Sequence, residues 1–471
     1  MDETSILETN KGSIAAPAGC GKTHLIAACL KASTDVKPVL ILTHTNAGVA
    51  ALRSRLDSAG VPPDRYRITT IDGWAMRLVG TFPGRSGQDP QVLSLRNPAS
   101  DYPAIRDGAL NILDGHHLHG ILEVTYSRVI VDEYQDCITQ QHRAISRLAN
   151  ILPTCVLGDD MQAIFGWGTN VLVDWSREVE IEFPPIGQLS TPWRWNNAGS
   201  TTLGQWLLWV REALKTGTPI DLRRAPSEVS WVQTTGADDI QAQTRAAYTA
   251  SPVTGGGALI VCDSRQPRRH RDIASRVRGA VVVENADLSD FIRFAEGFDF
   301  SAPAAADALI DFAGSTLTGV GAAQLKQRLA TLLAGRSQKP PTEAENAAVL
   351  FAGNPTPKSA LDFLVEINRQ SGVSQLRPAI LRACIQALNA CRSPAEFHEM
   401  AVRAREQSRM LGRALPNRAV GSTLLLKGLE ADVAIVLDTD TLDARNLYVA
   451  MTRGSRRLVI CSIEPILVRR I

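Results

Sequence analysis

One glycine-rich stretch constrains the fold of this chain more than any other. It reads Ala16-Pro17-Ala18-Gly19-Cys20-Gly21-Lys22-Thr23 and lies between apolar segments at 12–15 and 24–30. A strand, a tight glycine-rich turn and a helix together form the context of a phosphate-binding loop. The strict pattern begins with glycine, where this chain has Ala16. The alternative is a Gly-Lys-Thr helix start without a ligand, and the position of the whole stretch between strand and helix favours the phosphate loop.

The residue types of the loop suit the binding of a nucleotide with Mg²⁺. Backbone N–H groups of such a turn converge on phosphate oxygens, and glycines let the backbone approach without a Cβ atom in the way. Lys22 is predicted to contact the β- and γ-phosphates, and the Thr23 hydroxyl is suited to Mg²⁺. The predicted nucleotide-binding residues of the loop are Ala18, Gly19, Cys20, Gly21, Lys22 and Thr23.

Composition excludes several other classes of protein. A chain of 471 residues has the length of about two to four domains. Its net charge of only +2 argues against a uniformly basic nucleic-acid binder, so any such binding must use a local groove. The eight cysteines include no C-x-x-C pair, which leaves zinc and redox motifs unsupported. The polar N-terminus and the lack of a long apolar run predict a cytoplasmic protein that does not contact a membrane.

A pair of adjacent carboxylates follows an apolar strand at 128–131. Asp132 is suited to hold the nucleotide's Mg²⁺, and Glu133 to orient and deprotonate the attacking water. An Asp-Glu pair alone is often a solvated strand end. Downstream of a phosphate loop in the same α/β pattern, the pair is the matching half of an NTPase site.

Other strands also end in polar or aromatic residues. Thr45, Asn46 and Trp74 follow two expected strands, and ligands gather at the carboxyl ends of strands in open α/β sheets. Core packing is the favoured alternative for Trp74, as for any lone tryptophan.

The segment 155–167 forms a third expected strand with a polar end. Gln162 is placed to contact the γ-phosphate and the attacking water. Phe165 and Trp167 alternate along the chain and are candidates for stacking on bases, with interdomain packing as their alternative.

Taken together, these motifs resemble those of the UvrD/Rep-type DNA helicases of superfamily 1. Residues 189–194 are similar to the family's L-x-x-N-Y-R motif, which implies that Trp193 stacks on the adenine and Arg194 reaches the γ-phosphate. Residues 43–46 match its DNA-contacting T-F-T-N motif, which adds His44 to the predicted DNA contacts.

The resemblance extends to the end of the chain. Residues 422–430 resemble T-x-H-x-x-K-G-L-E, which implies that Gly428 approaches the phosphates and Glu430 binds the ribose. Residues 448–454 are similar to Y-V-A-x-T-R-A, which makes Arg453 the second arginine of the site. The family's adenine-reading glutamine is missing before the loop, and several DNA-contacting positions differ. The departures are His44, Asp72, Gly168, Pro192, Trp193 and Leu424.

The resemblance implies an α/β fold of two RecA-like P-loop NTPase domains with parallel sheets, each carrying a small, mainly helical insertion. It implies ATP and Mg²⁺ as cofactors, single-stranded DNA or DNA ends as partner, and movement from 3′ to 5′ by a helicase or translocase. The predicted boundaries are 1–77 and 128–187 for domain 1A, 78–127 for insertion 1B, 188–284 and 416–471 for domain 2A, and 285–415 for insertion 2B.

A second hypothesis comes from the short insertions and altered DNA motifs. In it, the chain is a DNA-stimulated, helicase-like ATPase that acts as the regulatory subunit of a partner nuclease. Helicase-like subunits of anti-phage defence systems such as Gabija resemble such a protein. The two hypotheses differ in whether the chain itself moves along DNA.

Overall fold

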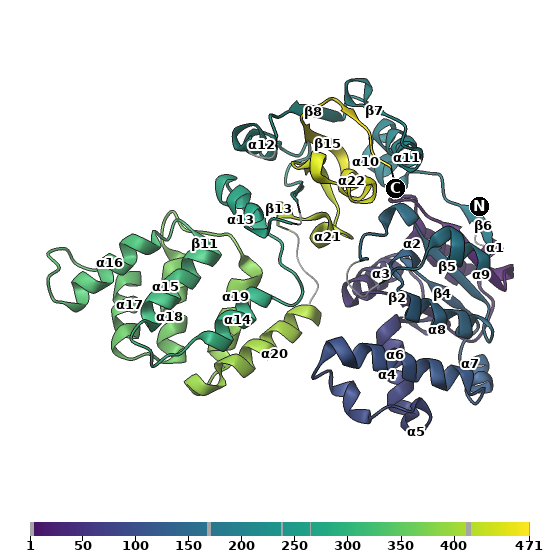
Figure 1. Cartoon of the computed structure of the whole chain (residues 1–471), viewed down its shortest axis with the longest axis horizontal. Coiled ribbons are helices and arrows are strands. Elements are labelled where there is room, and N and C mark those ends of the chain that lie inside the picture. Colours follow the sequence, from purple (N-terminus) through teal and green to yellow (C-terminus); the bar gives the residue numbers. More distant parts are fainter. Residues whose placement is uncertain (1–3, 167–170, 237–238, 264, 411–415, 471) are drawn as a thin grey trace. The chain divides into compact units, whose positions relative to one another are not determined.

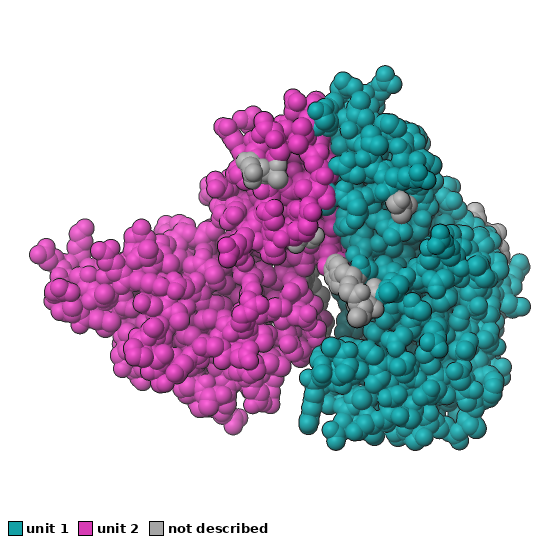
Figure 2. Space-filling model, viewed as in Figure 1, with its two compact units in different colours: residues 1–230, 442–457, 464–471 teal, residues 231–441, 458–463 magenta. Residues whose placement is uncertain are grey.

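The computed structural model describes residues 4–166, 171–236, 239–263, 265–410 and 416–470. The chain forms two compact units, which Figure 2 shows in teal and magenta. Unit 1 comprises residues 1–230, 442–457 and 464–471, and unit 2 comprises residues 231–441 and 458–463. The described helices include none with the length and apolar character needed to cross a membrane.

Unit 1 is built on a six-stranded parallel sheet with the order β3-β2-β4-β5-β1-β6. Its central strands are buried on both faces, which explains their unbroken apolar runs. Because β5 lies between β1 and β4, the carboxyl ends of these three strands meet at one edge. The strands are β1 (Lys11–Ala15), β2 (Val39–Thr43), β3 (Tyr66–Thr70), β4 (Val129–Val131), β5 (Thr154–Gly158) and β6 (Pro185–Gln188).

Helices surround this sheet, and a short antiparallel pair, β7 (Ile220–Asp221) and β16 (Ile466–Leu467), lies in the same unit. The helix α2 begins directly at the phosphate loop, and α22 returns to unit 1 from the far end of the sequence. The helices are α1 (Thr4–Glu8), α2 (Lys22–Ala32), α3 (Asn46–Ser58), α4 (Ile71–Thr81), α5 (Pro83–Ser86), α6 (Pro98–Asp114), α7 (His119–Thr125), α8 (Thr139–Ala149), α9 (Glu180–Glu182), α10 (Trp193–Ala198), α11 (Thr201–Thr216) and α22 (Ala444–Met451).

The segment 78–127, predicted as an insertion, folds as helices that share the apolar core of the sheet. Ile105 of α6 belongs to the same buried cluster as Leu40 of β2 and Trp74 of α4. A polar contact joins the same layers, because two nitrogens of Arg106 each donate to the Asp72 carboxylate at 2.7 Å. The helices α4, α6 and α8 therefore form one layer against the sheet (Figure 1).

A second six-stranded sheet has the order β10-β13-β9-β14-β15-β8, and β10, β13, β9 and β14 pair in parallel. Two such sheets with their helices confirm the predicted α/β class with two RecA-like domains. The strands are β8 (Val229–Gln233), β9 (Ala258–Val261), β10 (Ala280–Val282), β13 (Arg418–Gly421), β14 (Ala431–Val436) and β15 (Gly454–Ser462). The short helices α12 (Ile240–Ala247), α13 (Pro267–Arg276) and α21 (Thr423–Leu426) belong to unit 2.

The rest of unit 2 is a helical body (green in Figure 1) with a core rich in phenylalanine. It contains a two-stranded antiparallel pair, β11 (Leu317–Thr318) with β12 (Ser374–Gln375). The exact bounds predicted for the domains and insertions stay a prediction. The helices are α14 (Ser289–Gly297), α15 (Ala305–Thr316), α16 (Ala322–Leu333), α17 (Glu343–Gly353), α18 (Pro357–Arg369), α19 (Pro378–Ala390) and α20 (Phe397–Met410).

A buried ion pair fixes the start of α19. The Arg377 guanidinium donates to both oxygens of Glu284 at 2.6 and 2.8 Å and to Asp290 at 2.7 Å. Glu284 follows β10 and Asp290 lies in α14, so Arg377 connects the end of a sheet strand to two helices.

Replacing Arg377 with methionine should destabilise unit 2 by about 3–5 kcal/mol, because it leaves a buried carboxylate without its cation. Arg403→Met is the matched control, since Arg403 pairs with Glu399 on the exposed face of α20 and should cost only about 0–1 kcal/mol. Urea denaturation followed by circular dichroism measures both. Equal shifts of the transition in the two variants would contradict the prediction.

Candidate nucleotide-binding site

The phosphate loop of unit 1 adopts a backbone that requires glycine. Gly19 and Gly21 have φ angles of 70° and 87°, and Gly21 caps the start of α2. A Cβ atom at Gly19 would lie 2.6 Å from the ring of Trp195, and one at Gly21 would lie 2.8 Å from that of Trp193. The two glycines therefore permit both the turn and the close packing of residues 193–195 against it.

Lys22 reaches from the loop to both carboxylates at the end of β4. Its Nζ lies 3.1 Å from Asp132 Oδ1 and 2.5 Å from Glu133 Oε1. Burial disfavours the charged amine, but the two carboxylates outweigh burial and raise the pKa of Lys22 above its ordinary value. Burial also disfavours the charged form of Asp132. It therefore raises the pKa of this carboxyl group, although the positive charge of Lys22 acts in the opposite direction. Burial, with a smaller contribution from Asp159, raises the pKa of the Cys20 thiol to about 12 against the charges of Arg194 and Arg211, so the thiol stays neutral.

Glu133 sits on an unusual backbone. Its φ and ψ of 57° and 38° lie in the left-handed region, which few residues other than glycine adopt. The Asp132 carboxylate accepts a hydrogen bond from the Glu133 N–H at 3.0 Å. Gln135 Nε2 donates to Glu133 Oε2 at 2.6 Å. These two contacts hold the carboxylate at the turn after β4, and strained residues of this kind cluster at active sites.

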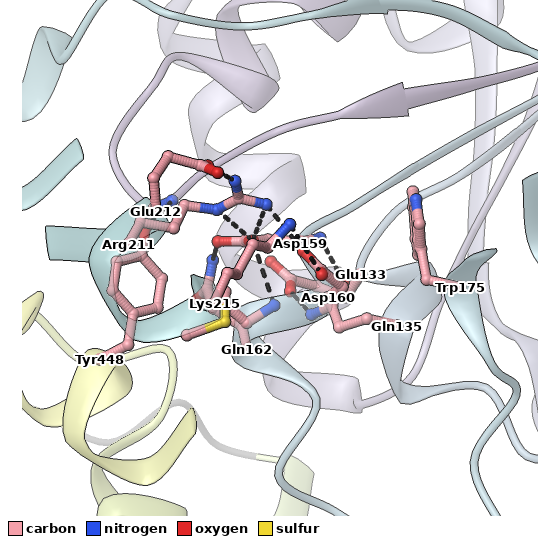
Figure 3. A network of polar contacts seen from close by, with 12 residues as sticks. Glu133, Gln135, Asp159, Asp160, Gln162, Trp175, Arg211, Glu212, Lys215 and Tyr448 are labelled. Carbon is pink, nitrogen blue, oxygen red and sulfur yellow. Dashed lines mark hydrogen bonds and ion pairs between the residues drawn. The ribbon is translucent and has the colours of Figure 1, made fainter. Parts of the chain in front are cut away.

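The neighbouring strand β5 brings Gln162 into the same polar network (Figure 3). Gln162 Nε2 donates to Asp159 Oδ2 at 3.0 Å, and the Asp159 N–H donates to Gln135 Oε1 at 3.1 Å. Gln135 thus joins Glu133 to Asp159. The predicted catalytic Glu133 and Gln162, from the ends of two adjacent strands, are connected through the Gln135 side chain and through the backbone N–H and carboxylate of Asp159.

The sequence analysis missed Arg211, which lies at the centre of this network. Its Nε donates to Asp159 Oδ1 at 2.9 Å, and its Nη2 lies 2.7 Å from Asp160, which also pairs with Lys215 at 2.8 Å. Burial opposes the charge of Arg211, but Asp159 and Asp160 raise its pKa above the ordinary value. The available signal was an arginine on the otherwise apolar, buried face of α11.

The segment 193–195 packs Arg194 against the loop. The Arg194 N–H donates to the Gly19 carbonyl at 3.1 Å, and its Nη1 donates to the Thr452 carbonyl at 2.6 Å. The Arg194 guanidinium also lies over the Trp195 ring, 5.3 Å from the ring centroid. Trp193 is 49% exposed, so its ring is accessible beside Gly21.

The second predicted arginine lies in the same part of unit 1. Arg453 is 2% exposed, and it donates from Nε to the Val449 carbonyl at 2.8 Å and from Nη2 to Thr452 Oγ1 at 3.0 Å. The Ala18 N–H of the loop donates to Tyr448 Oη at 3.3 Å. The helix α22 and the turn after it therefore contact the phosphate loop and Arg194.

Three other residues predicted to bind the nucleotide, Thr23, Gly428 and Glu430, lie outside the contacts described so far. The Thr23 hydroxyl accepts a hydrogen bond from Arg55 Nη1 at 3.2 Å at the start of α2. Gly428, with φ of 81°, and Glu430 follow α21 in unit 2. Contacts of Gly428 and Glu430 with a nucleotide stay a prediction.

The predicted DNA-binding residues differ in exposure. Thr45 and Asn46 are exposed after β2, where the Thr45 hydroxyl also caps α3, and His44 lies 3.5 Å from Cys137 Sγ. Phe165 is half-buried. Trp74 is 3% exposed within the apolar core, which supports the packing alternative and argues against a stacking role. Trp167 lies outside the described residues.

Comparison with known proteins gives one family match. Residues 97–171 match the family model of the UvrD/REP helicase N-terminal domain. Among solved structures, the Pif1 helicase from Candida albicans is similar over 98% of this chain and 94% of that chain, with 11% sequence identity and a TM-score of 0.40. No curated protein matches this chain. The family match confirms, over residues 97–171, the resemblance to UvrD/Rep-type helicases predicted from the motifs.

Proposed function

We propose that this chain is an ATP-dependent DNA helicase or translocase that hydrolyses ATP to move along single-stranded DNA from 3′ to 5′. The observation that carries the proposal is the contact of Lys22, from the phosphate loop, with Asp132 and Glu133 at the end of β4. A phosphate-binding cation and a candidate base thus occupy one site. Gln162 belongs to the same polar network.

The loop binds the triphosphate through its backbone N–H groups and the Lys22 amine. Trp193, exposed beside the loop, offers a face for the nucleotide base. The Thr23 hydroxyl and the Asp132 carboxylate are hard oxygen donors of the kind that Mg²⁺ prefers, so the residues present fit this cation. Mg²⁺, when bound with the nucleotide, neutralises charge on the β- and γ-phosphates.

Hydrolysis is the task of the residues around the loop. Glu133 accepts a proton from the attacking water, and Gln135 keeps the Glu133 carboxylate in place through its short hydrogen bond. Gln162 orients the same water. Arg194 and Arg453 stabilise the charge that develops on the transferring phosphoryl group.

DNA binding is proposed at the exposed ends of the first sheet. Thr45 and Asn46 after β2 supply polar contacts, and Phe165 after β5 supplies a face on which a base stacks. Because the strands β2 and β5 belong to the same sheet as the phosphate loop, hydrolysis and DNA contact are coupled through short connections.

The Glu133→Gln variant tests the function most directly. It should bind ATP as the wild type does but lose at least about a hundredfold in DNA-stimulated hydrolysis, because the amide accepts no proton from water. Lys22→Ala should instead weaken nucleotide binding. Fluorescent nucleotide titration and phosphate release on single-stranded DNA measure the two effects.

A strand-displacement and translocation assay on single-stranded, forked and blunt DNA completes this test. Movement with ATP supports a motor, whereas DNA-stimulated hydrolysis without movement, in a chain tested with and without its genomic neighbours' products, supports the regulatory subunit of a nuclease. Normal turnover in Glu133→Gln would remove this residue from the role of base.

Arg194→Lys should cut DNA-stimulated ATP hydrolysis by at least about a hundredfold, because lysine cannot reproduce the planar fork that stabilises a phosphoryl group. Arg453→Lys should do the same and also lower the melting temperature, since the Arg453 side chain is buried and bonded within its own turn. Nucleotide binding without turnover should change far less in both. A folded lysine variant with near-normal turnover would place that arginine outside the active site.

Phe165→Ala should weaken binding of single-stranded DNA by about 1–3 kcal/mol if Phe165 stacks on a base, while hydrolysis without DNA changes little. Trp209→Ala is a matched control, because Trp209 is an aromatic side chain on α11 that is 47% exposed. Fluorescence anisotropy with labelled oligonucleotides measures binding. Normal DNA binding with a lower melting temperature would instead assign Phe165 to packing.

A further inference from the structure

Asp159 is shared by two side chains that come from different elements. Its carboxylate is fully buried, with Oδ1 accepting from Arg211 at 2.9 Å and Oδ2 accepting from Gln162 at 3.0 Å. Its N–H donates to Gln135, which in turn donates to Glu133 (Figure 3). The side chain of Arg211 is only 3% exposed. The buried carboxylate therefore connects the helix α11 with Gln162, whereas the backbone N–H of the same residue leads to Gln135 and Glu133.

The geometry gives Arg211 a specific task. A carboxylate can rotate about its Cβ–Cγ bond, and its plane has to be held for one oxygen to face the Gln162 amide while the other faces Arg211. The planar fork of Arg211 bonds Asp159 through Nε and Asp160 through Nη2, so it fixes the rotation of the first carboxylate against the second. A buried ion pair is weak evidence for stability in itself, whereas an oriented one serves to position its neighbours.

We propose that Arg211 is a positioning residue for ATP hydrolysis, acting through the Asp159 carboxylate on the Gln162 side chain. The inference deepens the proposed function and rests on it. It makes turnover depend on α11, the helix that directly follows the segment carrying Arg194. The hydrogen bonds of Arg211 go to Asp159, Asp160 and Glu212.

The same helix offers a matched control. Lys215 lies one turn beyond Arg211 and pairs at 2.8 Å with Asp160, which also pairs with Arg211, but the Lys215 side chain is 28% exposed and its ion pair is with Asp160 and not with Asp159. Lys215→Met removes an equal charge from the same helix and the same carboxylate partner. It should leave kcat within about twofold of the wild type.

Arg211→Met should lower kcat for DNA-stimulated ATP hydrolysis at least tenfold and leave the KM for ATP within about threefold. Arg211→Lys, which keeps the charge but loses the fork, should recover part of kcat. The decisive measurement is a double-mutant cycle with Gln162→Ala. If Arg211 acts through Gln162, the double variant should be no slower than Gln162→Ala by more than about threefold.

Each outcome bears on the inference. Fully multiplicative losses in the cycle, or a folded Arg211→Met with wild-type kcat, would overturn it and leave ATP hydrolysis by the chain intact. If Arg211→Met fails to fold, Arg211→Lys decides: kcat at least threefold below the wild type with unchanged KM supports the inference, and wild-type kcat overturns it. A wild-type chain that hydrolyses no ATP would refute the proposed function and this inference with it.

Discussion

The positive charge of the buried Lys22 amine needs negative partners inside the protein. The contacts that supply them determine how the residues at the carboxyl ends of the first sheet are arranged. Two carboxylates at the end of β4 surround the amine, and neither the amine nor Asp132 could be buried at low cost without the other. The contact is available only because β1 and β4 run parallel with β5 between them, which brings their carboxyl ends to one side. The left-handed backbone of Glu133 completes the arrangement, since it turns the second carboxylate toward the loop.

A series of hydrogen bonds connects these carboxylates to the helix α11. Gln135 joins Glu133 to Asp159, and Asp159 joins both to Arg211 on α11. Arg194 meanwhile bonds the loop at Gly19 and the turn at Thr452. Segments that lie hundreds of residues apart in the sequence thus share one hydrogen-bonded neighbourhood, and all of them belong to unit 1.

Sequence reasoning found the loop, the carboxylate pair and the α/β class because each has a local pattern: glycines before Gly-Lys-Thr, an apolar run before Asp-Glu, and apolar runs that alternate with helices. It missed Arg211, because the partners of this arginine lie about 50 residues earlier in the chain and no local pattern links them. It favoured core packing for Trp74, and the structure places this residue in α4 with its ring in the apolar core that α4 shares with α6. The burial of Arg453 was likewise not predictable from a local pattern, and its hydrogen bonds include ones to a backbone carbonyl and a hydroxyl of its own turn.

The helical layer at 78–127 has a consequence for how unit 1 is put together. Ile105 and Leu40 occupy one continuous apolar core, and Arg106 bonds Asp72 beside it, so this layer is joined to the sheet by both apolar and ionic contacts. Helices and sheet should melt in a single cooperative step. A substitution in this helical layer would therefore shift the carboxyl ends of the strands. In this way a residue far from the phosphate loop helps to position the catalytic side chains.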